Sequence, residues 1–304
     1  MMGGPDARER NAAMPDTAPP APATLDAATH AWLREQVGDL PVVPMGEASA
    51  RLYAVGGDLV LRVFHDAERL AADPWYRPDN EARALRLLAA APVSTPVLVA
   101  ARPNAPEPAL LTTRVPGTPE PPSDTDALLG AIAQTLAAVH RVDAAGAGLA
   151  RYAPYYGPTE RIVPAWTTRE HVWRRAIAAL ESEPPPAAHG LIHRDFHTAQ
   201  LLWNGDAPPG VVDWTTACVG PRGIDLARVR LDLALAHGVA VAEEFLPVYA
   251  RAFGTAGEHH PYWDLLDAAD ALVDWPEPRD AREVVEWQRF EAWVGRAVRT
   301  LART

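Results

Sequence analysis

The stretch GLIHRDFHTAQLLW, residues 190–203, places a polar loop between two short apolar segments. Asp195 lies inside this loop, and Asp213, eighteen positions further on, ends a second apolar run, GVV. Short apolar runs bounded by turn-forming residues are typical of strands, and here QLLW and GVVDW are joined by the turn-rich NGDAPPG. Two aspartates on adjacent hairpin-like segments can therefore face one site, although a loop aspartate taken alone more often only caps a turn.

Such a pair of carboxylates fits the chemistry of phosphoryl transfer. One carboxylate orients and deprotonates the attacking hydroxyl, and the other holds the Mg²⁺ that bridges the nucleotide phosphates. Only eleven residues separate Asp213 from Asp225. That is too short for the long activation loop that orders protein kinases after phosphorylation, so a regulated protein kinase is disfavoured.

The residues around the two aspartates extend the pattern. The run H-R-D-x-x-x-x-(N/Q) is followed by a strand that ends in Asp213 and then by GPRGIDLARVR at 220–230. Together these motifs resemble the aminoglycoside phosphotransferase and choline kinase family, which has a protein-kinase-like fold. The resemblance covers about residues 38–304, and its specific part is 193–227.

The resemblance implies a role for each matching residue. Asp195 would be the catalytic base, and Gln200 and Asp213 would be the ligands of Mg²⁺. Asp225 would be a structural acid that supports the catalytic loop, and His193 would also be structural. ATP or GTP would be the co-substrate.

Gln200 is a departure from the family pattern, because such loops normally carry asparagine at this position. Glutamine offers the same amide oxygen, about one C–C bond or roughly 1.5 Å further from the backbone, whereas Mg²⁺ demands near-octahedral ligands at about 2.0–2.1 Å. We expect an active enzyme, and a catalytically weak nucleotide-binding protein is the alternative. Arg194 is expected at the surface or as an anchor of the loop.

The order of the expected elements predicts an α+β protein with two lobes. Residues 41–64 and 95–115 contain strand-like runs, with a helix at 79–91 between them, and the chain is mainly helical from residue 123 onward. With the resemblance, this is a small antiparallel-sheet N-lobe and a larger helical C-lobe. We expect a disordered leader at 1–22, the nucleotide-binding N-lobe at 23–117, and the C-lobe with catalytic loop and acceptor site at 118–304.

The strand-rich front carries the residues that the resemblance assigns to the nucleotide. A kinase-like fold has a cation on its third strand and an acid on the following helix that holds this cation, and Arg62 and Glu81 are the candidates. Backbone groups of Thr113, Arg114 and Val115 would hold the nucleotide base. An exposed strand arginine and a helix-start glutamate are the structural alternative.

Composition narrows the partners and the location. The formal net charge of -11 disfavours nucleic acid, and all 28 basic residues are arginines because the chain contains no lysine. Schiff-base chemistry and the Walker A phosphate loop are therefore excluded. The single Cys218, the lack of a signal-peptide pattern and the lack of about 18 uninterrupted apolar residues predict a soluble cytoplasmic protein, with its oligomeric state left open.

The acceptor site is expected in the last helices. Residues 243–291 hold twelve acidic side chains against four arginines. Helical spacing gathers acids on one face with tryptophans nearby in sequence: Asp264, Asp267, Asp270 and Asp274, with Trp263, Trp275 and Trp287. Acids with aromatic walls suit a small amine-bearing acceptor, for which Asp267 and Asp270 are the candidate contacts. A solvated helix face with core tryptophans is the alternative.

A metal-dependent hydrolase is a further alternative. If HRDFH were a strand, His193, Asp195 and His197 would point to one side and could bind a divalent metal, with His259 and His260 in reserve. This interpretation depends on that strand, because no other recognisable spacing of metal ligands occurs in the chain.

Overall fold

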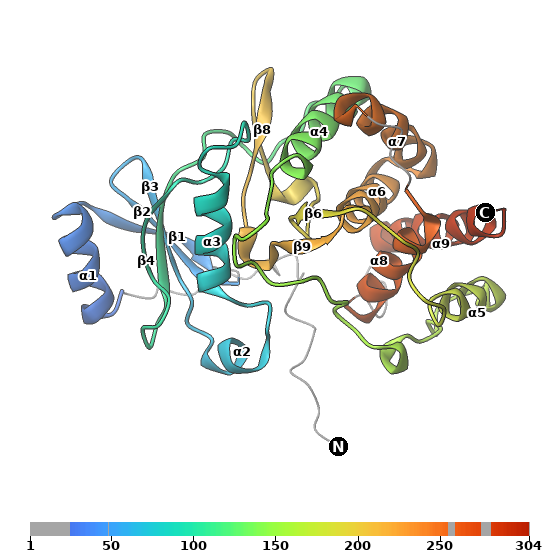
Figure 1. Cartoon of the computed structure of the whole chain (residues 1–304), viewed down its shortest axis with the longest axis horizontal. Helices are drawn as coiled ribbons and strands as arrows, with labels where there is room; N and C mark the ends of the chain where they lie inside the picture. Colours follow the sequence, from blue (N-terminus) through green and yellow to red (C-terminus); the bar gives the residue numbers. More distant parts are fainter. Residues whose placement is uncertain (1–24, 48, 255–258, 275–280, 304) are drawn as a thin grey trace.

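A computed structural model of the chain describes residues 25–47, 49–254, 259–274 and 281–303, with the backbone alone at 274, 281 and 282. The expected leader at 1–22 lies outside these residues. Figure 1 shows a sheet region at one end of the molecule and a helical region at the other, with α3 (Pro78–Leu88) between the sheet and the helices.

The sheet region contains one five-stranded antiparallel sheet with strand order β1-β2-β3-β5-β4. Its strands are β1 (Val42–Glu47), β2 (Arg51–Val55), β3 (Leu59–Val63), β4 (Leu98–Arg102) and β5 (Ala109–Thr113). Helix α1 (Ala27–Val37) precedes the sheet, and α2 (Ala67–Ala72) and α3 connect β3 to β4.

The alternation of side chains along β3 decides what each face of the sheet does. Leu61 and Val63 are buried in the core that the sheet forms with Leu33 of α1. Because successive strand residues point to opposite faces, Val60 and Arg62 face away from α1. The long cationic side chain of Arg62 is thereby directed toward the helical region.

The helical region consists of helices around two small hairpin-like sheets. Its helices are α4 (Thr125–His140), α5 (Glu170–Ala179), α6 (Gly223–His237), α7 (Val239–Phe253), α8 (Pro261–Asp274) and α9 (Ala281–Leu301). Strands β6 (His189–Ile192) and β9 (Cys218–Pro221) form one antiparallel pair, and β7 (Leu201–Asn204) and β8 (Ala207–Val211) form the other. Helix α6 is the central helix and packs against α7, α8 and α9.

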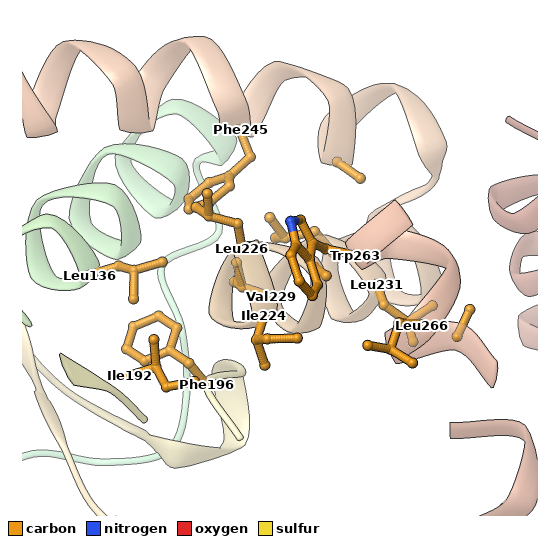
Figure 2. Packing of buried hydrophobic residues seen from close by; sticks show 14 of the residues in the cluster. Leu136, Ile192, Phe196, Ile224, Leu226, Val229, Leu231, Phe245, Trp263 and Leu266 are labelled. Atoms are coloured by element: carbon orange, nitrogen blue, oxygen red, sulfur yellow. The ribbon is translucent and has the colours of Figure 1, made fainter. Parts of the chain in front are cut away.

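The core of the helical region anchors the loop that contains Asp195. Ile192 and Phe196, on either side of the HRD sequence, are fully buried. Figure 2 shows both side chains near Leu136 of α4 and Ile224 of α6. A loop with apolar anchors at both ends is held by packing, so the polar residues between them can point to one place.

The connection between the two regions is bonded to the β7–β8 hairpin. Thr118 exchanges two backbone hydrogen bonds with Trp203, with N···O distances of 2.9 and 2.7 Å. Gly117 has a φ of +129°, and a Cβ there would lie 2.7 Å from the carbonyl oxygen of Trp203. A Cβ on Gly210 would lie 2.2 Å from Val115 Cγ1. Both glycines therefore permit a close approach that a larger residue would prevent.

The predicted fold class is confirmed, since the structure has a small antiparallel sheet and a larger helical part. Sequence analysis missed α2, β6 and β9, which are six or fewer residues long. No helix within the described residues is long and apolar enough to cross a membrane.

Candidate active site

Arg62 lies between two carboxylates where the sheet region meets the helical region. Its Nη1 is 2.5 Å from Oε1 of Glu81 on α3, and its Nη2 is 3.0 Å from Oδ1 of Asp213. The hydroxyl of Thr215 donates to Asp213 Oδ1 at 2.8 Å and lies 3.2 Å from Glu81 Oε2. The structure thus pairs Arg62 with Glu81 as expected and brings Asp213, which was predicted separately, to the same arginine. Thr215 was not predicted.

Local backbone geometry fixes this cluster. Asp213 has φ 61° and ψ 62°, the left-handed conformation, so the chain turns sharply as it leaves β8. Asn80 of α3 donates its amide hydrogens to the carbonyl oxygens of Thr215 and Ala217, at 3.0 and 2.8 Å. Helix α3 therefore holds the Asp213 turn directly, in addition to carrying Glu81.

The charges of the cluster stabilise one another. Burial alone would lower the pKa of Arg62, but the carboxylates of Glu81 and Asp213 raise it above its ordinary value. Burial likewise opposes ionisation of Asp213, yet Arg62 and the hydrogen bond from Thr215 lower its pKa. Burial raises the pKa of Glu81, with Arg62 opposing. The arginine remains charged and Asp213 remains a carboxylate at neutral pH.

The loop that carries Asp195 is held by a buried acid. Asp225 of α6 is fully buried and accepts the backbone N–H groups of His193 and Arg194, at 2.8 and 2.7 Å. Nε2 of His140 lies 3.1 Å from the same carboxylate. This geometry agrees with the predicted supporting role of Asp225.

Three nitrogen-bearing side chains surround Asp195: Arg228 and Gln200 donate hydrogen bonds to it, and His197 lies at ion-pair distance. Nε of Arg228 lies 2.9 Å from Oδ1, while Nε2 of His197 and Nε2 of Gln200 lie 3.5 and 3.3 Å from Oδ2. Burial would raise the pKa of Asp195, but the charges of His197 and Arg228 outweigh it and hold the pKa well below its usual range. Arg228 comes from α6 and was missed, because an arginine one turn after Asp225 carries no signal of its partner.

Gln200 ends a short 3-10 turn at 198–200 and faces Asp195 through its amide nitrogen. Its backbone carbonyl accepts the N–H of Val212 at 3.0 Å, which ties it to the strand before Asp213. The amide oxygen is not used by the bond to Asp195. An amide oxygen and a carboxylate are the kind of oxygen donors that Mg²⁺ prefers, so the chemistry of Gln200 and Asp213 fits a magnesium site.

Two acids of α8 lie on the other side of Asp195. The pKa of Asp267 is raised to about 7 by burial, and the negative charges of Asp195 and Asp264 add to this rise. Burial and the charge of Asp267 raise the pKa of Asp270 to about 7 as well. Within the described residues, Oδ2 of Asp267 and Oδ1 of Asp270 are buried without a hydrogen-bond partner. Neither carboxyl group has a salt bridge in the part of the chain that the structure describes, although the charge of Arg228 opposes the rise for Asp267 and the charges of Arg161 and Arg194 oppose it for Asp270.

Asp264, one turn earlier on α8, has a different environment. Both of its oxygens bond Nη1 of Arg230, at 2.7 and 2.6 Å, and Nε2 of His259 lies 2.8 Å from Oδ1. Asp264 is therefore an internal ion-pair residue of the helical core. The side chain of Asp274 lies outside the described residues.

The expected tryptophan wall is wrong for the two tryptophans that the structure describes. Trp263 packs beneath Gly223, where a Cβ would meet its ring at 2.3 Å, and Trp287 stacks on Trp166 in the core with a centroid distance of 5.0 Å. Trp275 lies outside the described residues. The backbone N–H of Tyr155 donates to Asp270 Oδ2 at 3.4 Å. The aromatic side chain near the acids is that of Tyr152, whose pKa is raised by burial and by the charges of Asp270 and Asp267.

The metal-dependent hydrolase alternative required HRDFH to be a strand, and the structure does not have a strand there. Strand β6 ends at Ile192, so HRDFH is a loop and its alternate residues do not share a strand face. Nε2 of His193 lies 2.9 Å from the carbonyl oxygen of Val212. Within the part of the chain that the structure describes, no group of three His, Cys, Asp or Glu side chains is arranged to hold a metal.

A row of small and apolar residues lies beside Arg62 on the same face of the sheet. Val43 pairs with Ala54, Ala54 with Val60, and Val60 with Thr112. Val43 is 57% exposed, whereas Thr112 is buried. An exposed valine on a sheet face leaves apolar surface available for a flat ligand. This row was not predicted, because the sequence does not show which strand faces meet.

The segment after β5 has some of its backbone groups already bonded. The N–H of Thr113 donates to the Val97 carbonyl oxygen at 2.9 Å, and the N–H of Arg114 donates to the Asp58 carbonyl oxygen at 2.7 Å. A ligand that binds at residues 113–115 would therefore have to hydrogen-bond with the backbone carbonyl groups of this segment or with the N–H of Val115.

Comparison with known proteins identifies a family and solved structures that are similar to this chain. The phosphotransferase enzyme family matches residues 41–266. No curated protein matches the chain. A solved structure of a Ralstonia eutropha JMP134 protein assigned as an aminoglycoside phosphotransferase shares 16% identity, with a TM-score of 0.61 over 91% of this chain and 98% of its own.

Two further solved structures contain bound molecules. A thermostable mutant of aminoglycoside phosphotransferase APH(4)-Ia, in a ternary complex with AMP-PNP and hygromycin B, is 18% identical with a TM-score of 0.60, covering 91% of this chain and 98% of its own. ADP-bound APH(2'')-Ib is 15% identical with a TM-score of 0.54, covering 91% and 99%. At these identities the likeness establishes a common fold.

Proposed function

Because the chain belongs to the phosphotransferase enzyme family, we propose that it transfers the γ-phosphate of ATP or GTP to a hydroxyl group of a small molecule. The observation that carries this proposal is the Arg62–Glu81–Asp213 cluster at the junction of sheet and helices, which Gln200 joins to Asp195. The Gln200 amide nitrogen lies 3.3 Å from Asp195 Oδ2, and its carbonyl oxygen accepts the N–H of Val212, next to Asp213. We also propose that residues 23–117 and 118–304 act as the two lobes between which the substrates bind.

The nucleotide would bind under the sheet. Its base would pack on the apolar row that includes Val43 and Val60, and would reach carbonyl groups of 113–115 or the N–H of Val115. The phosphates would extend toward Arg62, which Glu81 holds in place. Arginine can grip phosphate oxygens through two N–H groups, whereas the lysine more usual in the family presents a point charge.

Asp213 and Gln200 would hold Mg²⁺, Asp213 through its carboxylate and Gln200 through its amide oxygen. When bound, the metal neutralises charge on the phosphates. Asp213 already holds Arg62 through Oδ1, so its position does not depend on the ligand. Thr215 supports the same carboxylate oxygen and prevents its rotation.

Asp195 would accept the hydrogen bond of the acceptor hydroxyl and align its oxygen with the γ-phosphate. A depressed pKa is compatible with this role, because the transition state of phosphoryl transfer is loose and the hydroxyl proton is lost late. Orientation then matters more than basicity. Arg228 and the loop bonds to Asp225 fix that orientation.

The acceptor is proposed to carry an amine. Support comes from Asp267 and Asp270, each of which has one buried oxygen without a partner and a raised pKa. A bound ammonium group would restore both carboxylates to the ionised form. The APH(4)-Ia complex with hygromycin B is a solved example of a small-molecule acceptor in this fold.

A catalytically weak nucleotide-binding protein is the second candidate. The observation that favours it is the amide nitrogen of Gln200, which faces Asp195 across 3.3 Å. If Gln200 serves mainly to hold Asp195, the second metal ligand is lost and turnover falls while nucleotide binding persists.

A nucleotide-consumption screen over hydroxyl-bearing acceptors, with Mg²⁺, tests the proposal. We expect ATP or GTP with Mg²⁺ to raise the melting temperature, by mass action equivalent to about 2.7 kcal/mol at a hundredfold excess over the dissociation constant. We expect consumption to depend on an added acceptor. Stabilisation without consumption across the acceptor panel would favour the weak binder, and no stabilisation by either nucleotide would refute both candidates.

A further inference from the structure

Arg194, the residue before Asp195, adopts a conformation that its side chain does not favour. Its φ is +75°, and Arg194 and Asp213 are the two residues other than glycine with positive φ in the described part of the chain. Glycine occupies this region without steric cost, whereas a residue with a Cβ does not. A feature elsewhere in the structure must therefore compensate for an arginine at this position.

The side chain of Arg194 is enclosed between two aromatic rings. Its guanidinium carbon lies 3.5 Å from the ring centre of Trp75 and 3.6 Å from that of Tyr155. Two rings at such short distances can only lie on opposite faces of the planar group. Nη2 donates to the carbonyl oxygen of Ala153 at 2.7 Å, and the residue is 1% exposed. The predicted surface location is therefore wrong, and the predicted anchoring of the loop agrees with the geometry.

The two rings come from different parts of the molecule. Trp75 lies in the loop between α2 and α3 of the sheet region, yet its side chain packs against the core of the helical region. Its backbone N–H donates to Asp73 Oδ1 at 2.9 Å, which fixes its place in that loop. Tyr155 precedes α5 and holds Asp270 through its backbone. Arg194 thus joins the sheet region, the catalytic loop and the acceptor side.

No acidic side chain of the described residues bonds Arg194, so its charge is stabilised by the faces of the two rings. Its Nε and Nη1 are buried without a hydrogen-bond partner within the described residues. A flat, weakly hydrated guanidinium can be stabilised in this way, whereas the compact ammonium of lysine loses more hydration and cannot stack. The site therefore selects arginine by shape as well as by charge.

We propose that Arg194 is a positioning residue for phosphoryl transfer, acting through a clamp made of Trp75, Arg194 and Tyr155. The clamp sets the backbone angles immediately before Asp195, and so aims its carboxylate relative to the nucleotide side. It makes the position of the catalytic loop depend on a loop of the sheet region. The catalytic part of this inference rests on the proposed function, whereas the coupling between the two loops does not.

Amide hydrogen exchange tests the coupling in the nucleotide-free protein. Trp75→Leu removes one ring from a distant loop, and we expect exchange in the 193–198 peptide to become at least tenfold faster. Trp32→Leu is the matched control, since Trp32 also stacks on an arginine, Arg102, at 5.6 Å, away from the catalytic loop. Exchange in 193–198 that is unchanged by Trp75→Leu, or equally changed by both variants, would overturn the clamp.

Kinetics test the catalytic part, on an acceptor found by the screen. Arg194→Gly keeps the left-handed backbone accessible, and we expect kcat to fall at least tenfold while KM for the nucleotide changes less than threefold. Trp75→Leu alone should lower kcat by a similar factor. Adding Trp75→Leu to the Arg194→Gly variant should lower kcat no further. Arg194→Lys should show the same loss of kcat as Arg194→Gly, because lysine cannot stack between the rings. A kcat within twofold of the parent, or multiplicative losses in the double variant, would refute the positioning role. A parent protein without any acceptor would refute the proposed function, and hydrogen exchange would still decide the coupling.

Discussion

The acids on the two sides of Asp195 differ in how their charge is balanced. On the sheet side, Arg62 is held between Glu81 and Asp213 at 2.5 and 3.0 Å, so both carboxylates share a cation of the protein. On the α8 side, Asp267 and Asp270 have buried oxygens without partners and pKa values raised to about 7. The first arrangement is assembled before any ligand binds, whereas the second has no salt bridge within the described residues.

The largest expected effect comes from removing the charge of the central carboxylates. Asp195→Asn and Asp213→Asn should each lower kcat by about a thousandfold or more, or roughly 4 kcal/mol of barrier. Asparagine keeps size and hydrogen bonding but cannot supply the charge at either position. Steady-state turnover measures this, and Asp206→Asn, in the exposed β7–β8 turn, is the matched control that should leave kcat unchanged. Retention of a tenth of the activity by either variant would contradict the assigned roles.

The next effect should fall on the acceptor alone. Neutralising the α8 pair with Asp267→Asn and Asp270→Asn should raise the acceptor KM about ten- to a hundredfold, because the ammonium group loses its counter-charges. The nucleotide KM should stay within twofold.

A matched change on the same helix sharpens this result. Asp264→Asn breaks the internal ion pair with Arg230, so the melting temperature should fall while the acceptor KM is unchanged. An acceptor KM unaffected by the double variant would remove Asp267 and Asp270 from the acceptor site.

Gln200→Asn should have a smaller effect on turnover, within about tenfold or 1.4 kcal/mol of barrier. The amide oxygen is retained and Asp213 supplies the larger electrostatic attraction for the metal. Turnover should be measured over a range of Mg²⁺ concentrations, since a changed reach alters the metal requirement first. Activity that exists only after this substitution would show that Gln200 marks a lost metal site.

The smallest expected effect concerns stability and pH. Asp270 has a folded-state pKa of about 7, raised from 3.8, so between these values the unfolded state binds fewer protons and stability falls as pH rises. Asp270→Asn removes this loss, and the variant should melt higher than the parent by about 2 °C or more at pH 8, with a smaller difference at pH 5. Thermal melting at both pH values checks this. A difference that does not grow with pH would show that Asp270 is not held in its neutral form.

The parts of the site that could be predicted are those set by local sequence. Asp195 and Asp213 stand beside strand-like runs, and the helical spacing of Asp267 and Asp270 places them on one side of α8. The same spacing includes Asp264. Its partner Arg230 lies on another helix, so the local sequence around Asp264 does not indicate the ion pair. Spacing therefore predicted that these acids share one side of α8, and it could not distinguish an acid with an unpartnered oxygen from an acid in an internal ion pair.

The parts that could not be predicted depend on contacts between distant segments. Arg228 reaches Asp195 across 33 positions and Asn80 reaches Thr215 across 135, so no window of sequence contains both partners. The roles of the aromatic residues were also ambiguous. A tryptophan close to acids in the sequence gives the same pattern whether it lines a binding site or packs in the core. Trp287 fills the core, and Tyr152, which is less conspicuous in the sequence, is the aromatic side chain near the acids.

The bonding of Thr118 to Trp203 has a mechanical consequence. The connection at 115–118 is hydrogen-bonded to the β7–β8 hairpin and approaches it closely at Gly117 and Gly210. It should therefore move together with the helical region. Any rotation of the sheet against the helices must then pivot before Val115, toward the end of β5. Residues 115–118 and Asp195 therefore belong to one frame, and a rotation of the sheet would have to break the Arg62–Asp213 ion pair and the Asn80 hydrogen bonds that join the sheet region to it.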